Sequence, residues 1–243
     1  MTDIEAIREI INNAERIVFF GGAGVSTESG IPDFRSAGGL YAEDGGELGM
    51  SPEEILSVSC LTGRPDIFYR FYREKMLYPD AEPNAAHYAL AKLEDMGKLT
   101  AVITQNIDGL HQKAGSRSVI ELHGSVLKNY CVNCDEKYSL DYILATDGVP
   151  ECEVCGDFVR PDVVMYGESL PTGEFYAAEE AIFAADVLIV GGTSLTVHPA
   201  ASLVECFEGE HLIIINKSPT PYDDCAEYVI RDSIADVLSA IVE

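Results

Sequence analysis

Four cysteines constrain the middle of this chain more than any other feature of its sequence. They form two C-x-x-C pairs, Cys131 with Cys134 and Cys152 with Cys155. The spacing of the two pairs is typical of zinc sites built from four thiolates. A closed tetrahedral site leaves no coordination position for water or substrate, so such a zinc ion is structural. The alternative is two pairs of ordinary buried cysteines, and the spacing favours zinc.

The rest of the chain alternates between short apolar runs and segments of helical period. The apolar runs predict strands at 16–20, 99–104, 119–122, 163–166, 186–190, 211–216 and 228–230. The helical segments lie at 3–14, 52–60, 66–76, 84–96, 173–185, 199–207 and 233–242. This alternation, with strands that are apolar on both faces, indicates an α/β fold with a parallel sheet.

Two stretches interrupt the alternation, a glycine-rich one after residue 37 and the cysteine-bearing one. We expect a single catalytic domain over 1–243 with two lobes. The large lobe would comprise about 1–37, 77–127 and 161–243, and the small lobe the insertions at about 38–76 and 128–160. A cleft would then lie between the lobes.

The charge balance excludes some classes of function. The chain has 41 acidic and 16 basic residues, a net charge of −25, whereas nucleic-acid binding requires a basic surface. An acidic surface either attracts basic peptides or serves only solubility. No apolar run approaches the roughly 18 residues that span a membrane, and the N-terminus lacks a signal-peptide pattern. The three remaining cysteines are scattered, which suits a reducing compartment, so we predict a cytoplasmic protein.

Glycines follow the first predicted strand directly, at Gly21, Gly22 and Gly24. Glycine at this position lets the backbone approach a phosphate group. However, Thr27 stands where a G-x-G-x-x-G motif has its third glycine, and Pro32 disfavours a regular helix. We therefore expect a loop here, which is either part of a nucleotide site or a tight structural turn.

Polar residues gather at the ends of the other predicted strands. Gln105, Asn106 and Asp108 follow the second strand, His123 the third, and Asn216 the sixth. Ligands of open α/β sheets bind outside the carboxyl ends of the strands. His123 is a candidate general base, although a lone histidine is more often structural. Asn216 either binds a ribose or forms a turn before Pro219.

In their order along the chain, these blocks resemble the sirtuin family. The motifs that carry the resemblance are GAGVS at 22–26, GIPDFR at 30–35, TQNID at 104–108, HG at 123–124, the two C-x-x-C pairs, RP at 160–161, YGE at 166–168 and GTSL at 192–195. Together they span nearly the whole chain, from Ile17 to about Lys217.

The resemblance implies an NAD-dependent protein-lysine deacetylase with an inverted variant of the Rossmann-like sheet and a smaller zinc-binding lobe. NAD would be consumed as a co-substrate, and one zinc ion per chain would be structural. The acyl group of acyl-lysine would pass to ADP-ribose, which releases nicotinamide, O-acetyl-ADP-ribose and deacetylated lysine. The alternatives are a preference for longer neutral acyl groups, or mono-ADP-ribosyl transfer. The implied partners are acyl-lysine peptides, with no nucleic acid and no membrane, and the protein would be a monomer.

The resemblance also assigns site residues. The catalytic residues would be His123, Asn106 and Asp108. The NAD contacts would be Ala23, Thr27, Phe34, Arg35, Gln105, Ile107, Asp108, His123, Thr193, Ser194, Asn216, Lys217 and Ile234. The peptide would lie along Val164, Tyr166, Gly167, Glu168 and Leu195.

One departure concerns the acyl group. Desuccinylase-type members have an arginine that pairs with the substrate carboxylate, and Tyr72 stands at that position here. Arg73 lies one residue away, so this alignment is sensitive to a gap. With Tyr72 in place, the sequence disfavours acidic acyl groups.

Overall fold

In the computed structural model, residues 3–34, 36, 38–40 and 49–242 are described. A parallel sheet of six strands has the order β3-β2-β1-β7-β8-β9. The strands are β1 (Ile17–Gly21), β2 (Leu99–Thr104), β3 (Val119–Glu121), β7 (Val187–Gly191), β8 (His211–Ile215) and β9 (Tyr228–Ile230). The α/β prediction is confirmed, and six of the seven predicted strands form this sheet.

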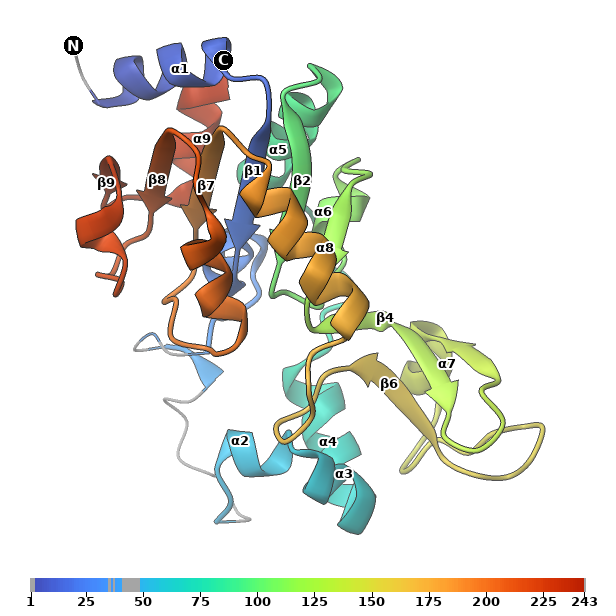
Figure 1. The fold of residues 1–243 in the computed structure, drawn as a ribbon. Coiled ribbons are helices and arrows are strands. Elements are labelled where there is room, and N and C mark those ends of the chain that lie inside the picture. Colours follow the sequence, from blue (N-terminus) through green and yellow to red (C-terminus); the bar gives the residue numbers. More distant parts are fainter. Residues whose placement is uncertain (1–2, 35, 37, 41–48, 243) are drawn as a thin grey trace.

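Helices cover both faces of the sheet (Figure 1). One face packs against α1 (Asp3–Asn13), α5 (Ala85–Asp95) and α9 (Ile234–Val242), and the other against α8 (Thr172–Phe183) and a 3-10 helix at Ala200–Cys206. The middle strands are buried at every position, as strands with two covered faces must be. Asn84 caps α5 as expected, because its side-chain oxygen accepts the N–H of Ala86 at 2.9 Å.

A second, antiparallel sheet has the order β5-β4-β6. Its strands are β4 (Gly124–Cys131), β5 (Lys137–Ser139) and β6 (Val159–Val163), and α7 (Leu140–Ala145) follows β5. The helices α2 (Pro52–Ile55), α3 (Val58–Gly63) and α4 (Pro65–Lys75) come from the other insertion. Figure 1 shows the small sheet and these helices beyond the carboxyl ends of the main strands.

The two insertions share one hydrophobic core. Phe68 and Tyr69 of α4 belong to the same buried cluster as Cys131, Ile143 and Val159. The Tyr69 hydroxyl also donates a hydrogen bond to the Val159 carbonyl. Two segments that are distant in sequence therefore form one packed unit.

Two local predictions were wrong, and a third predicted helix, at 199–207, is present but of the 3-10 type. Residues 163–166 are not a strand of the main sheet: Val163 ends β6, which pairs with β4, and Gly167 then turns the chain with φ of 92°. The single helix expected over 52–60 is two helices, because Ser57 caps a new one by accepting the N–H of Cys60. The segment 199–207 contains a 3-10 helix at Ala200–Cys206.

Candidate active site

A cleft of about 1280 Å³ lies where the main strands end and face the small lobe. The strand order reverses on either side of β1, whose last residue Gly21 is paired with Thr104 of β2 and Gly191 of β7. The segments that follow these three strands therefore leave the sheet at one point. Open α/β sheets bind their ligands at such a point.

The glycine loop after β1 packs tightly against the loop after β7. The Gly24 N–H donates to the Gly192 carbonyl at 2.8 Å, and a Cβ on Gly24 would lie 2.8 Å from the Gly192 Cα. Two 3-10 turns, Ala23–Val25 and Thr27–Ser29, follow in place of a helix. The expected loop is confirmed, and close loop packing is one reason why glycine is needed at position 24.

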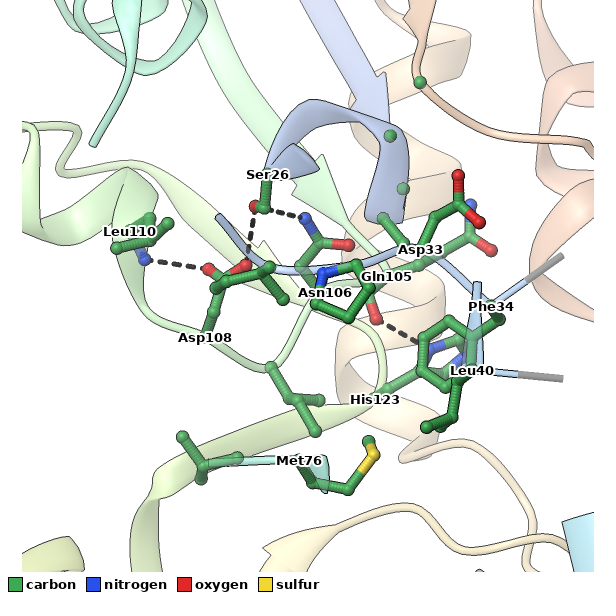
Figure 2. Close-up of a pocket in the computed structure, with 18 of the residues that line it drawn as sticks. Ser26, Asp33, Phe34, Leu40, Met76, Gln105, Asn106, Asp108, Leu110 and His123 are labelled. Atoms are coloured by element: carbon green, nitrogen blue, oxygen red, sulfur yellow. Dashed lines mark hydrogen bonds between the residues drawn. The ribbon is translucent and has the colours of Figure 1, made fainter. Parts of the chain in front are cut away.

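Ser26 joins two of the predicted catalytic residues (Figure 2). Its hydroxyl donates to Asp108 Oδ2 at 2.7 Å and accepts a hydrogen bond from Asn106 Nδ2 at 3.1 Å. The Leu110 N–H donates to Asp108 Oδ1 at 2.9 Å. Burial raises the pKa of Asp108, while the hydrogen bonds from the Leu110 N–H and the Ser26 hydroxyl lower it in part. The network fixes two side chains that lie 82 and 80 residues from Ser26 in sequence.

His123 has a defined tautomer. Its Nδ1 lies 2.9 Å from the Gln105 carbonyl oxygen, which can only accept a hydrogen bond (Figure 2). Nδ1 therefore carries the proton, and Nε2 keeps a lone pair. Burial lowers the pKa of His123, so the ring is neutral at pH 7. A half-buried neutral imidazole with a free Nε2 is suited to accept a proton.

Side chains at the strand ends make two further hydrogen bonds, one of which connects two strands. Gln105 Nε2 donates to Thr193 Oγ1 at 3.0 Å, which ties the end of β2 to the end of β7. Asn216 Nδ2 donates to the Ser218 carbonyl at 2.7 Å, as expected of a turn-forming asparagine. Its side-chain oxygen remains available to a ligand, so both interpretations of Asn216 are compatible with the structure.

Most of the predicted site residues line this one cleft. Those that do are Ala23, Thr27, Phe34, Gln105, Asn106, Ile107, Asp108, His123, Val164, Tyr166, Gly167, Glu168, Thr193, Ser194, Asn216, Lys217 and Ile234. Leu195 does not line it, because its side chain is 1% exposed and packs in the core. Arg35 lies outside the described residues.

The segment after β6 is held in place by an ion pair. Arg160 makes a bidentate contact with Glu168, at 2.7 Å from Nη1 to Oε1 and 2.8 Å from Nη2 to Oε2. The Glu168 carboxylate also accepts the N–H of Met165 at 2.9 Å. These bonds close a loop around residues 163–168, so the carboxylate of Glu168 positions this segment.

Tyr72 and Arg73, the two residues compared above for acyl selectivity, have different environments. Tyr72 lines the cleft, whereas Arg73 Nε donates to the Ile143 carbonyl at 2.9 Å and the Arg73 side chain is not part of the lining. Tyr72, and not Arg73, therefore faces the cleft. The structure thus places Tyr72 at the cleft, while its effect on acidic acyl groups stays a prediction.

The four cysteines of the C-x-x-C pairs converge at one point. Their Sγ atoms all lie within 4.8 Å of one another, with Cys131 to Cys155 at 3.4 Å and Cys134 to Cys152 at 3.5 Å. Tetrahedral Zn–S bonds of about 2.3 Å place sulfur atoms about 3.8 Å apart, so the quartet fits a zinc ion. The Tyr138 hydroxyl, at 3.2 Å from Cys152 Sγ, supplies an outer contact. All four ligand positions are cysteines, as in a structural site.

Ser26 is a site residue that sequence reasoning missed. It lay inside the GAGVS motif, yet no role followed from its position, because its partners are distant in sequence. Leu40, Leu56 and Met76 of the insertion at 38–76 also line the cleft and were not predicted. Their apolar character gave no signal that distinguishes a cleft wall from a core.

Comparison with known proteins gives consistent results. The Sir2 family model matches residues 22–199. An NAD-dependent protein deacetylase of Clostridium perfringens is 54% identical over 99% of this chain and 98% of its own. A structure of Sir2 with a p53 peptide and NAD+ is similar, with 39% identity, a TM-score of 0.85 and coverage of 98% of this chain and 96% of that one. A Sir2 structure bound to a propionylated peptide has 38% identity, a TM-score of 0.85 and the same coverage.

Proposed function

Because the chain belongs to the Sir2 family, we propose that it is an NAD-dependent protein deacetylase that acts on acetyl-lysine in peptides. The observation that carries the proposal is the arrangement of the cleft. The His123 to Gln105 contact and the Asn106, Ser26 and Asp108 network lie in the same cleft, at the strand ends where this fold binds ligands.

NAD, when bound, supplies an activated ribose carbon that loses nicotinamide and whose ADP-ribose accepts the acyl group. The residues present fit such a co-substrate. The loops after β1 and β7 are rich in glycine, where a backbone can approach phosphates. Asn216 and Lys217 extend the same edge, and Ile234 provides an apolar wall.

His123 is proposed as the general base. Its Nε2 lone pair takes the proton of a ribose hydroxyl, while the Gln105 carbonyl holds the Nδ1 proton and stabilises the imidazolium that forms. The lowered pKa keeps the base unprotonated at neutral pH.

The Ser26 network is proposed to orient the nicotinamide end. Asp108 and Asn106 offer an acceptor and amide atoms that are fixed before the ligand arrives, so little rotamer freedom is lost on binding. Phe34 lines the same cleft, and its ring is proposed to exclude water from the reacting carbon.

The peptide is proposed to lie along residues 164–168 and the loop 192–197. If the peptide adds a strand there, main-chain hydrogen bonds supply most of its contacts. The site would then recognise the acyl-lysine and select only weakly among the residues that flank it.

No helix of the described residues is long and apolar enough to cross a membrane. We also place the protein in the cytoplasm, supported by the three scattered cysteines Cys60, Cys206 and Cys225 outside the C-x-x-C pairs. The net charge of −25 supports the absence of nucleic-acid partners, and we propose a monomer on the family resemblance alone.

The test is nicotinamide release. Mixing the protein with NAD and an acetyl-lysine peptide should release nicotinamide, and omission of either substrate should prevent it. His123→Ala should lower kcat/KM about 10²–10⁴-fold, as loss of a positioned base does. His211→Ala is the matched control, because His211 begins β8 at the opposite end of the sheet. Equal activity of the two variants would contradict the role of His123.

A further inference from the structure

The end of the cleft next to α4 has apolar walls. Tyr72, Leu40 and Val126 belong to the buried cluster of the small lobe, and Met76 and Ile107 pack against it. All five of these residues line the cleft. The proposed base His123 lines the same cleft as these five residues. An acyl chain longer than acetyl would enter this apolar end.

One residue of this apolar end, Tyr72, also carries a polar atom. The Tyr72 hydroxyl is buried and has no hydrogen-bond partner among the described residues, and the side chain is 1% exposed. Its ring stacks on Phe68 at 5.3 Å with an interplanar angle of 17°, which fixes its orientation. The neighbouring Tyr69 hydroxyl, by contrast, is bonded to the Val159 carbonyl. Buried hydroxyls in native proteins normally have a partner, so Tyr72 requires an explanation.

We propose that Tyr72 makes this pocket favour, among acyl groups longer than acetyl, neutral chains that carry a hydroxyl over unsubstituted chains of the same length. The 3-hydroxybutyryl group represents the favoured class, and butyryl the unsubstituted one. This inference rests on the proposed deacetylase function and names a substrate class for the same site.

The preference follows from the state of the hydroxyl before the substrate binds. Tyr72 has already lost its contact with water in the folded protein, so pairing it with a ligand requires no further desolvation of the tyrosine. A substrate hydroxyl exchanges a bond to water for a bond to Tyr72, whereas an alkyl chain leaves the tyrosine unpaired. Burial raises the pKa of Tyr72, and the neutral hydroxyl can both donate and accept.

An acidic acyl group is the competing substrate. Lys75 also lines the cleft, and its ammonium lies 3.9 Å from Glu74 Oε1. A succinyl chain that reached Lys75 would be bound by charge and would not need Tyr72. Acetyl, butyryl, 3-hydroxybutyryl and succinyl peptides of one sequence therefore belong in a single experiment.

The experiment measures kcat/KM by nicotinamide release at saturating NAD. The wild type should favour 3-hydroxybutyryl over butyryl, and Tyr72→Phe should lower that ratio about five- to thirtyfold, the effect of one buried hydrogen bond. Tyr69→Phe is the matched control, because it removes a hydroxyl that is already bonded outside the cleft, and its ratio should equal that of the wild type.

The ratio of kcat/KM for the 3-hydroxybutyryl and butyryl peptides tests this inference separately from the proposed deacetylase function. An unchanged ratio in Tyr72→Phe, or a succinyl peptide that exceeds 3-hydroxybutyryl, would overturn the inference while acetyl turnover leaves the proposed function intact. Absence of nicotinamide release with every peptide would refute the proposed function itself. If Tyr72→Phe does not fold, the wild-type ratio decides, because a value of one or less contradicts the preference.

Discussion

A pair of buried histidines should make the stability of this protein depend steeply on pH. His87 and His111 are 0% and 1% exposed, and their ring centroids lie 4.8 Å apart. The Asn84 N–H donates to His87 Nδ1 at 3.2 Å, which requires that nitrogen to be unprotonated. Burial lowers the pKa of His87 to about 4, and burial together with the neighbouring His87 lowers that of His111 to about 3.

The direction of the effect follows from these values. An unfolded histidine has a pKa of about 6.5, so the unfolded chain binds protons that the folded pair refuses. The contribution of the neutral histidine pair to the free energy of unfolding is fully present above about pH 6.5. It falls as the pH drops toward the pKa values of the pair in the folded protein. Between pH 7 and pH 5, each of the two histidines lowers the free energy of unfolding by about 2 kcal/mol, or about 4 kcal/mol together.

The assay is urea unfolding of the wild type and of His111→Phe at both pH values. The variant should lose about 2 kcal/mol less than the wild type between pH 7 and pH 5. A packing change caused by phenylalanine contributes at both pH values and cancels in this difference, as do the carboxylates common to both proteins. His198→Gln alters an exposed histidine and should leave the difference unchanged. The same pH dependence in His111→Phe and wild type would refute the reasoning.

Four further outcomes follow from the cleft and the small lobe. Because burial lowers the pKa of His123, the acidic limb of kcat/KM should lie below pH 6.5, and a limb at pH 7 or above would contradict a buried base. Ser26→Ala should lower kcat/KM for NAD about 10–100-fold, since it removes a hydrogen bond to a carboxylate; steady-state kinetics decide, and an unchanged value would exclude the network from binding. Glu168→Gln should raise KM for the peptide more than it lowers kcat, because the Arg160 pair positions the segment 163–168, and the opposite split would argue against this role. Chelation of zinc should unfold the small lobe, seen as lost near-ultraviolet dichroism of its tyrosines, and a folded, active, metal-free protein would show that the thiols need no ion.

The main sheet could be predicted because strands buried on both faces are apolar at nearly every position, and such runs are visible in the sequence. Runs such as IVFF at 17–20 and VLIV at 187–190 are apolar on both faces, and the structure covers both faces with helices. The polar residues at the strand ends could be predicted for the same reason. Once the strands are parallel, Gln105 and Thr193 must emerge at one edge.

The contacts between distant segments could not be predicted from local pattern. Nothing near Ser26 in sequence indicates that it bonds to Asp108, and nothing near Tyr72 shows that its hydroxyl lacks a partner. The run at 163–166 looked like a buried strand because it is apolar (VVMY), although only Val163 belongs to β6 and the rest follows it. Which sheet a strand joins depends on its partner, and here that partner is β4.

The most direct test of the account measures the fate of the acetyl group. One turnover should convert one acetyl-lysine into one lysine, with one nicotinamide and one O-acetyl-ADP-ribose, each quantified by mass spectrometry in the same reaction. Equal amounts of the three products would support acyl transfer to ADP-ribose in the cleft around His123. Free acetate without nicotinamide, or a peptide that gains ADP-ribose and keeps its acetyl group, would contradict it.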